Sequence, residues 1–306
     1  MKIRPNVQKL KRFITSFSDF FNRFEDLQQA VARIEMRQLA NLKLDSLQGY
    51  EFKAYSQNGE DGIIQFLINH VQICKNTFVE FGVHNYLESN TRFLLKQNNW
   101  SGLVIDGSQR NIDFIKSDPL YWQHNLKAEC AFVNRDNINC LISSNGLRGD
   151  LGLLSIDIDG NDYWVWEAVD CVNPCIVICE YNSLFGPTAK VSVPYDENFI
   201  YNLAHYSTLY WGASIAAFHY LARKKGYSLV ASNSSGNNIF FVRDDLLGDL
   251  PHLSPEQAHV KSSFRTSRDP QGNLTFLDAQ DSFSIVADLP LRDVSTGQVV
   301  TLRDIT

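Results

Sequence analysis

Residues 77–108 read TFVEFGVHNYLESNTRFLLKQNNWSGLVIDGS, and this stretch decides the fold. The apolar run 78–81 carries Glu80 and is followed by Gly82. A helix-length segment comes next, and a second apolar run ends in Asp106. The order predicts a strand, a tight glycine turn, a helix and a second strand. Such a unit places an acidic side chain where it can bind the hydroxyl pair of a ribose. The stretch therefore indicates a site for a nucleotide-type cofactor.

The composition around this stretch is typical of a soluble globular chain. The 306 residues are 44% hydrophobic and 20% charged, with a net charge of −6. This acidic balance offers no basic face for nucleic acid, and no run reaches the ~20 apolar residues of a membrane span. Six cysteines lie in or near apolar runs without a secretory signal before them. We therefore expect a cytoplasmic protein with reduced, buried thiols.

Residues 1–48 form an N-terminal segment with helical periodicity. Apolar side chains recur every three and four residues alternately, which is the a/d pattern of a coiled coil; they are Leu10, Phe13, Phe17, Phe20, Phe24, Leu27, Val31 and Ile34. Three interpretations are open. The helix docks on its own domain, it forms a coiled coil that makes a homo-oligomer, or it attaches to a membrane surface through its phenylalanines and basic end.

From residue 77 onward, predicted strands and helices alternate. The predicted strands are 77–82, 102–106, 129–134, 152–158 and 175–181. The predicted helices between them are about 88–98, 110–117, 136–144 and 162–169. These spacings suit βα units with a parallel sheet that is covered on both faces. A helix and an antiparallel hairpin follow, at 212–225 and at 227–233 with 239–243. We therefore expect an α/β fold with a mostly parallel seven-stranded sheet and an antiparallel closing hairpin.

Two further segments complete the predicted organisation. The stretch 183–211 is irregular, contains seven aromatic residues and is too long for an ordinary connection. We expect it to form a lid or a substrate wall. The domain itself is expected over residues 49–250, and residues 251–306 form a polar C-terminal extension that packs on it.

Several longer motifs resemble a bacterial family of SAM-dependent methyltransferases related to the FkbM type (SAM is S-adenosylmethionine). They are Tyr55-Ser-Gln-Asn-Gly-Glu-Asp-Gly62, Phe78-Val-Glu-Phe-Gly82, Glu88-Ser-Asn-Thr91, Trp100-Ser-Gly-Leu-Val-Ile-Asp-Gly107, Ser155-Ile-Asp-Ile-Asp-Gly-Asn-Asp-Tyr-Trp164 and Glu180-Tyr-Asn182. The resemblance covers about residues 50–306. It implies a class I, Rossmann-like fold and SAM-dependent transfer, often to a sugar hydroxyl in glycan or natural-product biosynthesis. The chain departs from many members of this family by keeping a single glycine, Gly82, in the first turn.

SAM requires polar groups for its amino acid, an acid for its ribose and an apolar slot for its adenine. Glu80 and Gly82 are expected near the methionine part, and Asp106 beside the ribose. The remaining candidates for cofactor binding are polar or small residues of neighbouring turns, namely Gln57, Asn90, Gly107, Ser108 and Asn134. Of these, Asn134 follows the third predicted strand and is expected near the adenine edge.

Acidic and amide side chains also follow the fourth and fifth predicted strands. Asp157 and Asp159 share a two-residue spacing, as do Glu180 and Asn182, so each pair is expected to point to one side. The carboxyl ends of parallel strands meet at one crevice. Three carboxylates and an amide are ligands suited to Mg²⁺, Mn²⁺ or Ca²⁺. The arrangement is similar to that of metal-dependent O-methyltransferases, in which the metal lowers the pKa of the acceptor hydroxyl.

Several alternatives stay open at this point. Without metal, an aspartate or His219 acts as the general base, or the acidic residues have only binding or structural roles. Aromatic residues such as Tyr195 either stack on a sugar or pack in the core. The rival functions for the chain are an NAD-dependent Rossmann enzyme and a non-catalytic scaffold that assembles partners through the N-terminal helix.

Overall fold

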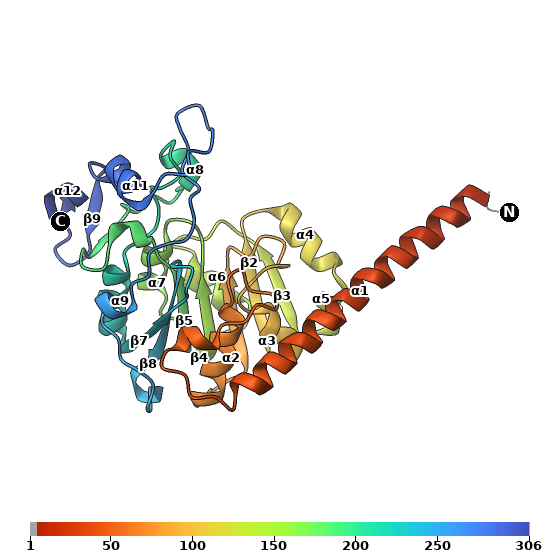
Figure 1. The fold of residues 1–306 in the computed structure, drawn as a ribbon. Helices are drawn as coiled ribbons and strands as arrows, with labels where there is room; N and C mark the ends of the chain where they lie inside the picture. Colours follow the sequence, from red (N-terminus) through yellow and green to blue (C-terminus); the bar gives the residue numbers. More distant parts are fainter. Residues whose placement is uncertain (1–4, 306) are drawn as a thin grey trace.

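A seven-stranded sheet forms the centre of the molecule (Figure 1). The computed structural model describes residues 5–305, and for residues 5–19, 21 and 22 it describes the backbone alone. The strand order is β3-β2-β1-β4-β5-β8-β7. The strands are β1 Thr77–Phe81, β2 Ser101–Asp106, β3 Leu126–Cys130, β4 Gly149–Ile156, β5 Val172–Glu180, β7 Tyr227–Ser232 and β8 Asn238–Arg243.

The strand directions confirm the fold expected from the sequence. β1 to β5 run parallel to one another, whereas β8 is antiparallel to both β5 and β7. Phe81, at the end of β1, pairs with Ile105 of β2 on one side and with Ile156 of β4 on the other. The strand order therefore reverses at β1, and open α/β sheets bind ligands at the carboxyl ends beside such a switch point.

Helices cover both faces of the sheet. α2 Glu60–His70, α3 Arg92–Gln97, α4 Gln109–Ser117 and α5 Pro119–Gln123 pack on one face, through residues such as Ile63, Leu94 and Ile112. α6 Ile138–Ser144, α7 Asp162–Ala168 and α9 Ile215–Lys225 pack on the other, through residues such as Ile142, Trp166 and Phe218. Every residue of β1 is buried, because both faces of this central strand are covered.

The N-terminal helix α1, Pro5–Leu39, docks by one face on the domain and projects beyond it (Figure 1). Glu25 pairs with Lys96 at 2.6 Å, and Gln29 donates to the Tyr55 hydroxyl at 3.1 Å. The C-terminal half of α1 therefore docks on the domain, which is one of the three arrangements that the sequence left open. The predicted positions Leu10, Phe13 and Phe17 lie outside the described side chains. Over residues 5–305, no helix is long and apolar enough to cross a membrane.

A second, three-stranded sheet ties the C-terminal extension to the segment that follows β5. Its order is β10-β9-β6, with β6 Val191–Ser192, β9 Leu291–Asp293 and β10 Val299–Val300. Val191 and Leu291 share a small apolar core. The remaining short elements are η1 Leu47–Tyr50, η2 Ser183–Phe185, α8 Tyr201–Ala204, η3 Asp244–Leu246, α10 Pro255–Ala258, α11 Ala279–Val286 and α12 Leu302–Ile305.

Three sequence expectations need correction. The third strand is Leu126–Cys130 rather than 129–134, because Leu126 and Ala128 supply the buried positions and the apolar residues after 130 form a loop. The helix predicted from residue 88 begins only at Arg92, since the residues before it bond to Glu80. Cys74, Cys130 and Cys140 are exposed, so burial holds only for Cys175 and Cys179 and in part for Cys171.

A buried carboxylate organises the loop that precedes α2. One oxygen of Asp61 accepts hydrogen bonds from three consecutive backbone amides, those of Ala54 at 2.8 Å, Tyr55 at 2.6 Å and Ser56 at 2.7 Å. The Ser56 hydroxyl in turn accepts from the Asp61 amide at 3.0 Å. Because α1 contacts this loop at Tyr55, Asp61 also fixes the surface on which α1 docks.

We predict that Asp61→Ala lowers the free energy of unfolding by about 2–4 kcal/mol, because three buried amides lose their acceptor. Urea denaturation at neutral pH measures this change. Asp113→Ala is the matched control, since Asp113 is exposed and its side chain accepts from Gln109 alone among residues 5–305. The control should change stability by less than about 0.5 kcal/mol. Equal effects of the two substitutions would contradict the role of Asp61.

Candidate functional site

A cavity of about 150 Å³ lies at the carboxyl ends of β1, β2 and β4, where the strand order reverses. Glycines, carboxylates and apolar side chains line it; they include Gly82, His84, Asp106, Gly107, Phe132, Val133, Asp157, Asp159, Asn161 and Phe199. Five of the residues predicted from the sequence to serve the cofactor or the reaction beside it therefore meet in one place: Gly82, Asp106, Gly107, Asp157 and Asp159.

The turn after β1 depends on its single glycine. Gly82 has a positive φ of 73°, and a Cβ at this position would lie 1.6 Å from the carbonyl oxygen of Asp157. The next turn residues, His84 and Tyr86, also adopt positive φ values, of 47° and 63°. The chain thus makes this turn with one glycine and with non-glycine residues in left-handed conformations. Left-handed non-glycine residues of this kind cluster at functional sites.

Glu80 holds the segment that leads into α3. Its carboxylate is buried and accepts from the Ser89 hydroxyl at 2.8 Å, the Asn90 amide at 2.9 Å, and both the amide and the hydroxyl of Thr91. Burial raises the pKa of Glu80, and these hydrogen bonds oppose that rise. The Asn90 side chain extends the network to Ser155 of β4 at 3.1 Å. Glu80 and Asn90 therefore do not line the cavity. Their hydrogen bonds position the segment between β1 and α3.

The predicted ribose acid, Asp106, lines the cavity at the end of β2. Its Oδ1 accepts from the Ser108 amide at 2.8 Å and from the Asn111 side chain at 2.9 Å. No hydrogen bond to Oδ2 is found among residues 5–305, so this oxygen is available to a ligand. Ser108 itself is the N-cap of α4 and does not line the cavity.

Two further cofactor predictions fall outside the cavity. Asn134 lies in the loop before α6. Its side chain accepts hydrogen bonds from the backbone amides of Asp136 and Asn137, both at 3.0 Å. Gln57 is exposed in the loop organised by Asp61, and its carbonyl accepts from Lys53 at 3.0 Å. Neither residue lines the cavity.

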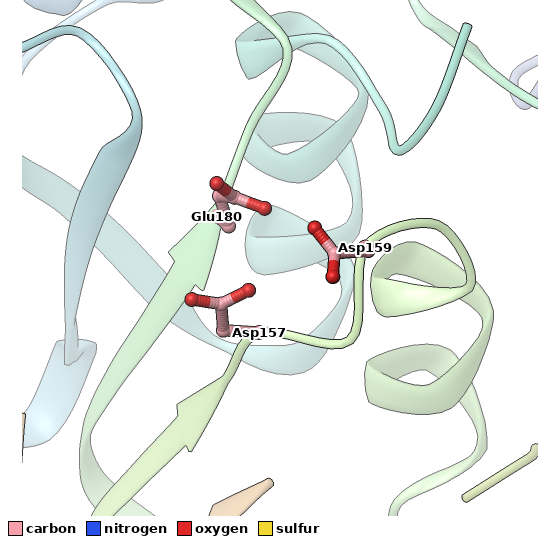
Figure 2. A group of neighbouring side chains, drawn as sticks. All are labelled: Asp157, Asp159 and Glu180. Carbon is pink, nitrogen blue, oxygen red and sulfur yellow. The ribbon is translucent and has the colours of Figure 1, made fainter. Parts of the chain in front are cut away.

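Asp157, Asp159 and Glu180 form an acidic trio at the edge of this cavity (Figure 2). One carboxylate oxygen from each lies within 4.8 Å of the others. Figure 2 shows the three side chains directed toward one another from the ends of β4 and β5. The sequence predicts a strand to residue 158 whose period places Asp157 and Asp159 on one side. The structure instead ends β4 at Ile156, and Asp159 reaches the trio through a positive φ of 57°.

The electrostatics of the acidic trio are those of crowded like charges. Burial raises the pKa of Asp157 well above its usual value, and the charges of Asp159 and Asp162 add to the effect. The pKa of Glu180 is also raised well above its usual value, first by burial and then by Asp157 and Asp159. Glu180 Oε2 is buried without a hydrogen-bond partner among the described residues. The trio is therefore poised to hold a proton or to bind a cation.

Asp162 and Asn161 fix the loop that carries Asp159. The two oxygens of Asp162 accept from the amides of Ile158 at 2.9 Å and Gly160 at 2.8 Å. Burial raises the pKa of Asp162 to about 6, although the hydrogen bonds oppose this. Asn161 donates to the carbonyl of Asp196 at 2.7 Å, which attaches the loop to the segment after β6.

Two predicted site residues do not join the acidic trio. Asn182 accepts from the Leu184 amide at 3.1 Å and donates to the carbonyls of Leu209 and Trp211, both at 3.0 Å, so its amide holds the following loop. His219 faces His252, with ring centroids 6.4 Å apart, and burial lowers its pKa. The structure therefore does not bring His219 to the trio as a general base.

The sequence did not single out several residues of the cavity. Phe132 and Val133 had been placed in a strand, whereas they line the cavity from the loop after β3. Phe199 lies among the aromatic residues of 183–211, and it packs where a Cβ on Gly160 would lie. The sequence feature that could have pointed to Phe199 is its position within that long aromatic segment. His84 stood in the first turn, and its charge lowers the pKa of Asp159 against the effect of burial.

Comparisons with known proteins give distant likenesses. No family model and no curated protein matches this sequence. The N-terminal domain of EvdMO1, crystallised in the presence of SAH and D-fucose, is 11% identical with a TM-score of 0.40, over 69% of this chain and 95% of that chain. An O-methyltransferase from Bacillus cereus in complex with SAH is 13% identical with a TM-score of 0.37, over 71% and 90%. At these TM-scores the likeness does not define a shared activity.

We predict that Gly82→Ala destabilises the protein by more than about 3 kcal/mol, because it combines left-handed strain with a collision against the Asp157 carbonyl. Gly149→Ala is the matched control: Gly149 also has a positive φ, of 69°, but nothing lies within 4 Å of its missing Cβ. The control should cost about 1 kcal/mol. Thermal and urea unfolding of the two variants separate backbone strain from the collision. Equal losses of stability in the two variants would show that the close approach of residue 82 to the Asp157 carbonyl is unimportant.

Proposed function

We propose that this protein is a SAM-dependent methyltransferase that methylates a hydroxyl of a sugar-containing small molecule. The observation that carries the proposal is the juxtaposition of Gly82 and Asp106 with the acidic trio at one switch point of a parallel sheet. SAM, when bound, supplies an electrophilic methyl group on a sulfonium. Asp106 Oδ2 offers an acceptor to the ribose hydroxyls, and Phe132 and Val133 offer an apolar wall to the adenine.

The cavity is smaller than the cofactor it would hold. Small-molecule sites occupy roughly 300–1,000 Å³, whereas this cavity measures about 150 Å³. Phe199 enters it from the segment between β6 and α8. Entry of SAM therefore requires this segment to move away from Gly160. Such a movement agrees with the lid or substrate wall expected from the sequence.

The acidic trio would remove the proton of the acceptor hydroxyl. A carboxylate with a raised pKa is a better base near neutral pH than an ordinary one, which suits Asp157 and Glu180. The donor set also fits a divalent cation such as Mg²⁺ or Mn²⁺, because three carboxylate oxygens converge and Glu180 Oε2 lacks a partner among the described residues. A bound cation would supply Lewis acidity that lowers the pKa of the hydroxyl.

The apolar stripe of α1 supports assembly with a second copy of the chain. Phe24, Leu27, Val31 and Ile34 are 59%, 61%, 49% and 52% exposed on the face opposite the docked one. Their alternating spacing matches the seam that a partner helix requires. Residues 20–39 carry three acidic and three basic side chains, so this part of the helix offers no net attraction to an anionic membrane.

We predict that isothermal titration gives binding of SAM or SAH in the micromolar range and none of NAD, since the single-glycine turn and the antiparallel closing hairpin argue against an NAD site. Asp106→Asn should weaken SAM binding about tenfold, because hydrogen bonds to a charged acceptor are worth about 1.5–3 kcal/mol. Asp113→Asn is the control. Tight NAD binding would favour the dehydrogenase alternative, and binding of neither cofactor would favour a scaffold.

We predict that Mn²⁺ raises the Tm of the wild-type protein, and that Asp157→Asn and Glu180→Gln each weaken Mn²⁺ binding at least about tenfold. The wild-type affinity should rise between pH 5 and pH 8, because carboxyls with raised pKa values must lose protons before they bind the metal. Calorimetry across this range measures both effects. Methyl transfer that proceeds fully in a chelator would instead support the metal-free base.

We predict that the chain is a dimer by light scattering and that Leu27→Gln with Val31→Gln makes it monomeric, because the stripe loses its apolar contacts. Asp26→Asn, an exposed change on the same helix, should leave the dimer intact. A wild-type monomer that sediments with vesicles would support membrane attachment in place of dimerisation.

A further inference from the structure

A second cavity, of about 490 Å³, lies beside α7 and is larger than the cofactor cavity. Four segments that are distant in the sequence build it. Arg135 comes from the loop after β3, Tyr163 and Trp164 begin α7, Tyr195 follows β6, and Arg292 belongs to β9 of the C-terminal extension. Its volume lies within the roughly 300–1,000 Å³ of small-molecule sites.

The two arginines make this cavity cationic in an acidic protein. Arg135 has one carboxylate neighbour, Asp136 at 3.8 Å, and both side chains are too exposed for a strong ion pair. Arg292 donates to the carbonyl of Gly297 and has no carboxylate within 4.0 Å among residues 5–305. Glu167 also lines the cavity, and its negative charge raises the pKa of Lys225 against the effect of burial. The guanidinium groups of Arg135 and Arg292 thus retain N–H donors that can bind a ligand.

Aromatic rings also line the wall, and those of Trp164 and Tyr195 are held in place. The Trp164 indole donates to the carbonyl of Val193 at 2.9 Å. The Trp164 and Tyr195 rings meet edge to face, with centroids 6.5 Å apart. The Arg135 guanidinium lies 4.0 Å from the centroid of the Tyr195 ring, which orients its fork. Rigid rings of this kind offer apolar faces to the C–H groups of a pyranose, and guanidinium forks match a phosphate or a carboxylate.

The segment after β6 connects this cavity to the acidic trio. Tyr195 lines the second cavity, Phe199 lines the cofactor cavity, and Asp196 between them accepts the hydrogen bond from Asn161. Asp159 and Trp164 are likewise only five residues apart, across the start of α7. A ligand in the second cavity therefore lies beside the same loop that holds the trio.

We propose that the cavity between Arg135, Trp164, Tyr195 and Arg292 binds an anionic sugar, a pyranose that carries a phosphate or a carboxylate. Its role as the anchor of the methyl acceptor rests on the proposed function, whereas the binding itself does not. The anion pairs with the two guanidinium groups, and the sugar ring lies against the aromatic wall. The C-terminal extension, by supplying Arg292, determines which acceptors are held.

Calorimetry with the full chain tests this site through four probes: glucose 1-phosphate, glucuronate, methyl glucoside and inorganic phosphate. We expect one of the two anionic sugars to bind at least tenfold more tightly than methyl glucoside and than inorganic phosphate. Arg135→Ala and Arg292→Ala should each weaken that binding about tenfold, with partial recovery in Arg135→Lys and Arg292→Lys. Arg303→Ala is the matched control, because Arg303 is exposed and pairs with Asp288 at 2.6 Å elsewhere on the extension.

Each remaining outcome overturns the proposal. Equal binding of the neutral and the anionic sugars would show that the arginines do not recognise the anion. If Arg303→Ala weakened sugar binding as much as Arg135→Ala or Arg292→Ala, the loss would reflect overall charge rather than this cavity. Inorganic phosphate that binds as tightly as glucose 1-phosphate would leave an anion site without a sugar site. A SAM titration of the same samples keeps the two proposals apart. SAM binding without sugar binding refutes this site alone, and sugar binding without SAM binding refutes the methyltransferase alone.

Discussion

The close approach of Gly82 to the carbonyl oxygen of Asp157 is the constraint on which the rest of the site depends. It joins the end of β1 to the end of β4, where the two strands are neighbours in the sheet. Any side chain at residue 82 would collide with the Asp157 carbonyl and force the backbone there to move. The same contact brings the turn that carries His84 beside the loop that carries Asp159. One missing methyl group thus sets how closely the turn after β1 approaches the loop after β4.

The acids around this contact divide into two kinds by their hydrogen bonds. Glu80, Asp61 and Asp162 accept from backbone amides and position loops. Among residues 5–305, no backbone amide is found bonded to Asp157 or Glu180, and these two side chains face one another and Asp159 instead. Burial raises the pKa of acids of both kinds, so a raised pKa alone does not mark a reactive group. What distinguishes the trio is the crowding of three carboxylates, which the charge of His84 offsets in part at Asp159.

Apolar runs and their spacing were enough to predict the order of strands, the antiparallel hairpin and the convergence of Asp157, Asp159 and Glu180. Residue spacing did not predict the position of a side chain correctly where that side chain has hydrogen-bond partners that the sequence does not reveal. Asn182 sits two residues after Glu180, but the chain turns there and its amide bonds to Leu209 and Trp211. Asp159 reached the predicted place by a left-handed residue rather than by strand geometry. Cavity residues such as Phe199 depend on long-range packing that no local pattern records.

Both ends of the chain act on the site through its loops rather than through its strands. At the N-terminal end, α1 bonds to Tyr55, whose carbonyl accepts from the Ser89 amide, and the Ser89 hydroxyl donates to Glu80. At the C-terminal end, β9 pairs with β6, and the chain continues from β6 to Tyr195 and Phe199. The sheet therefore supplies a fixed row of strand ends, and the two terminal segments hold the loops above it. Changes in either terminal segment can alter what the site admits without moving Asp106 or the acidic trio.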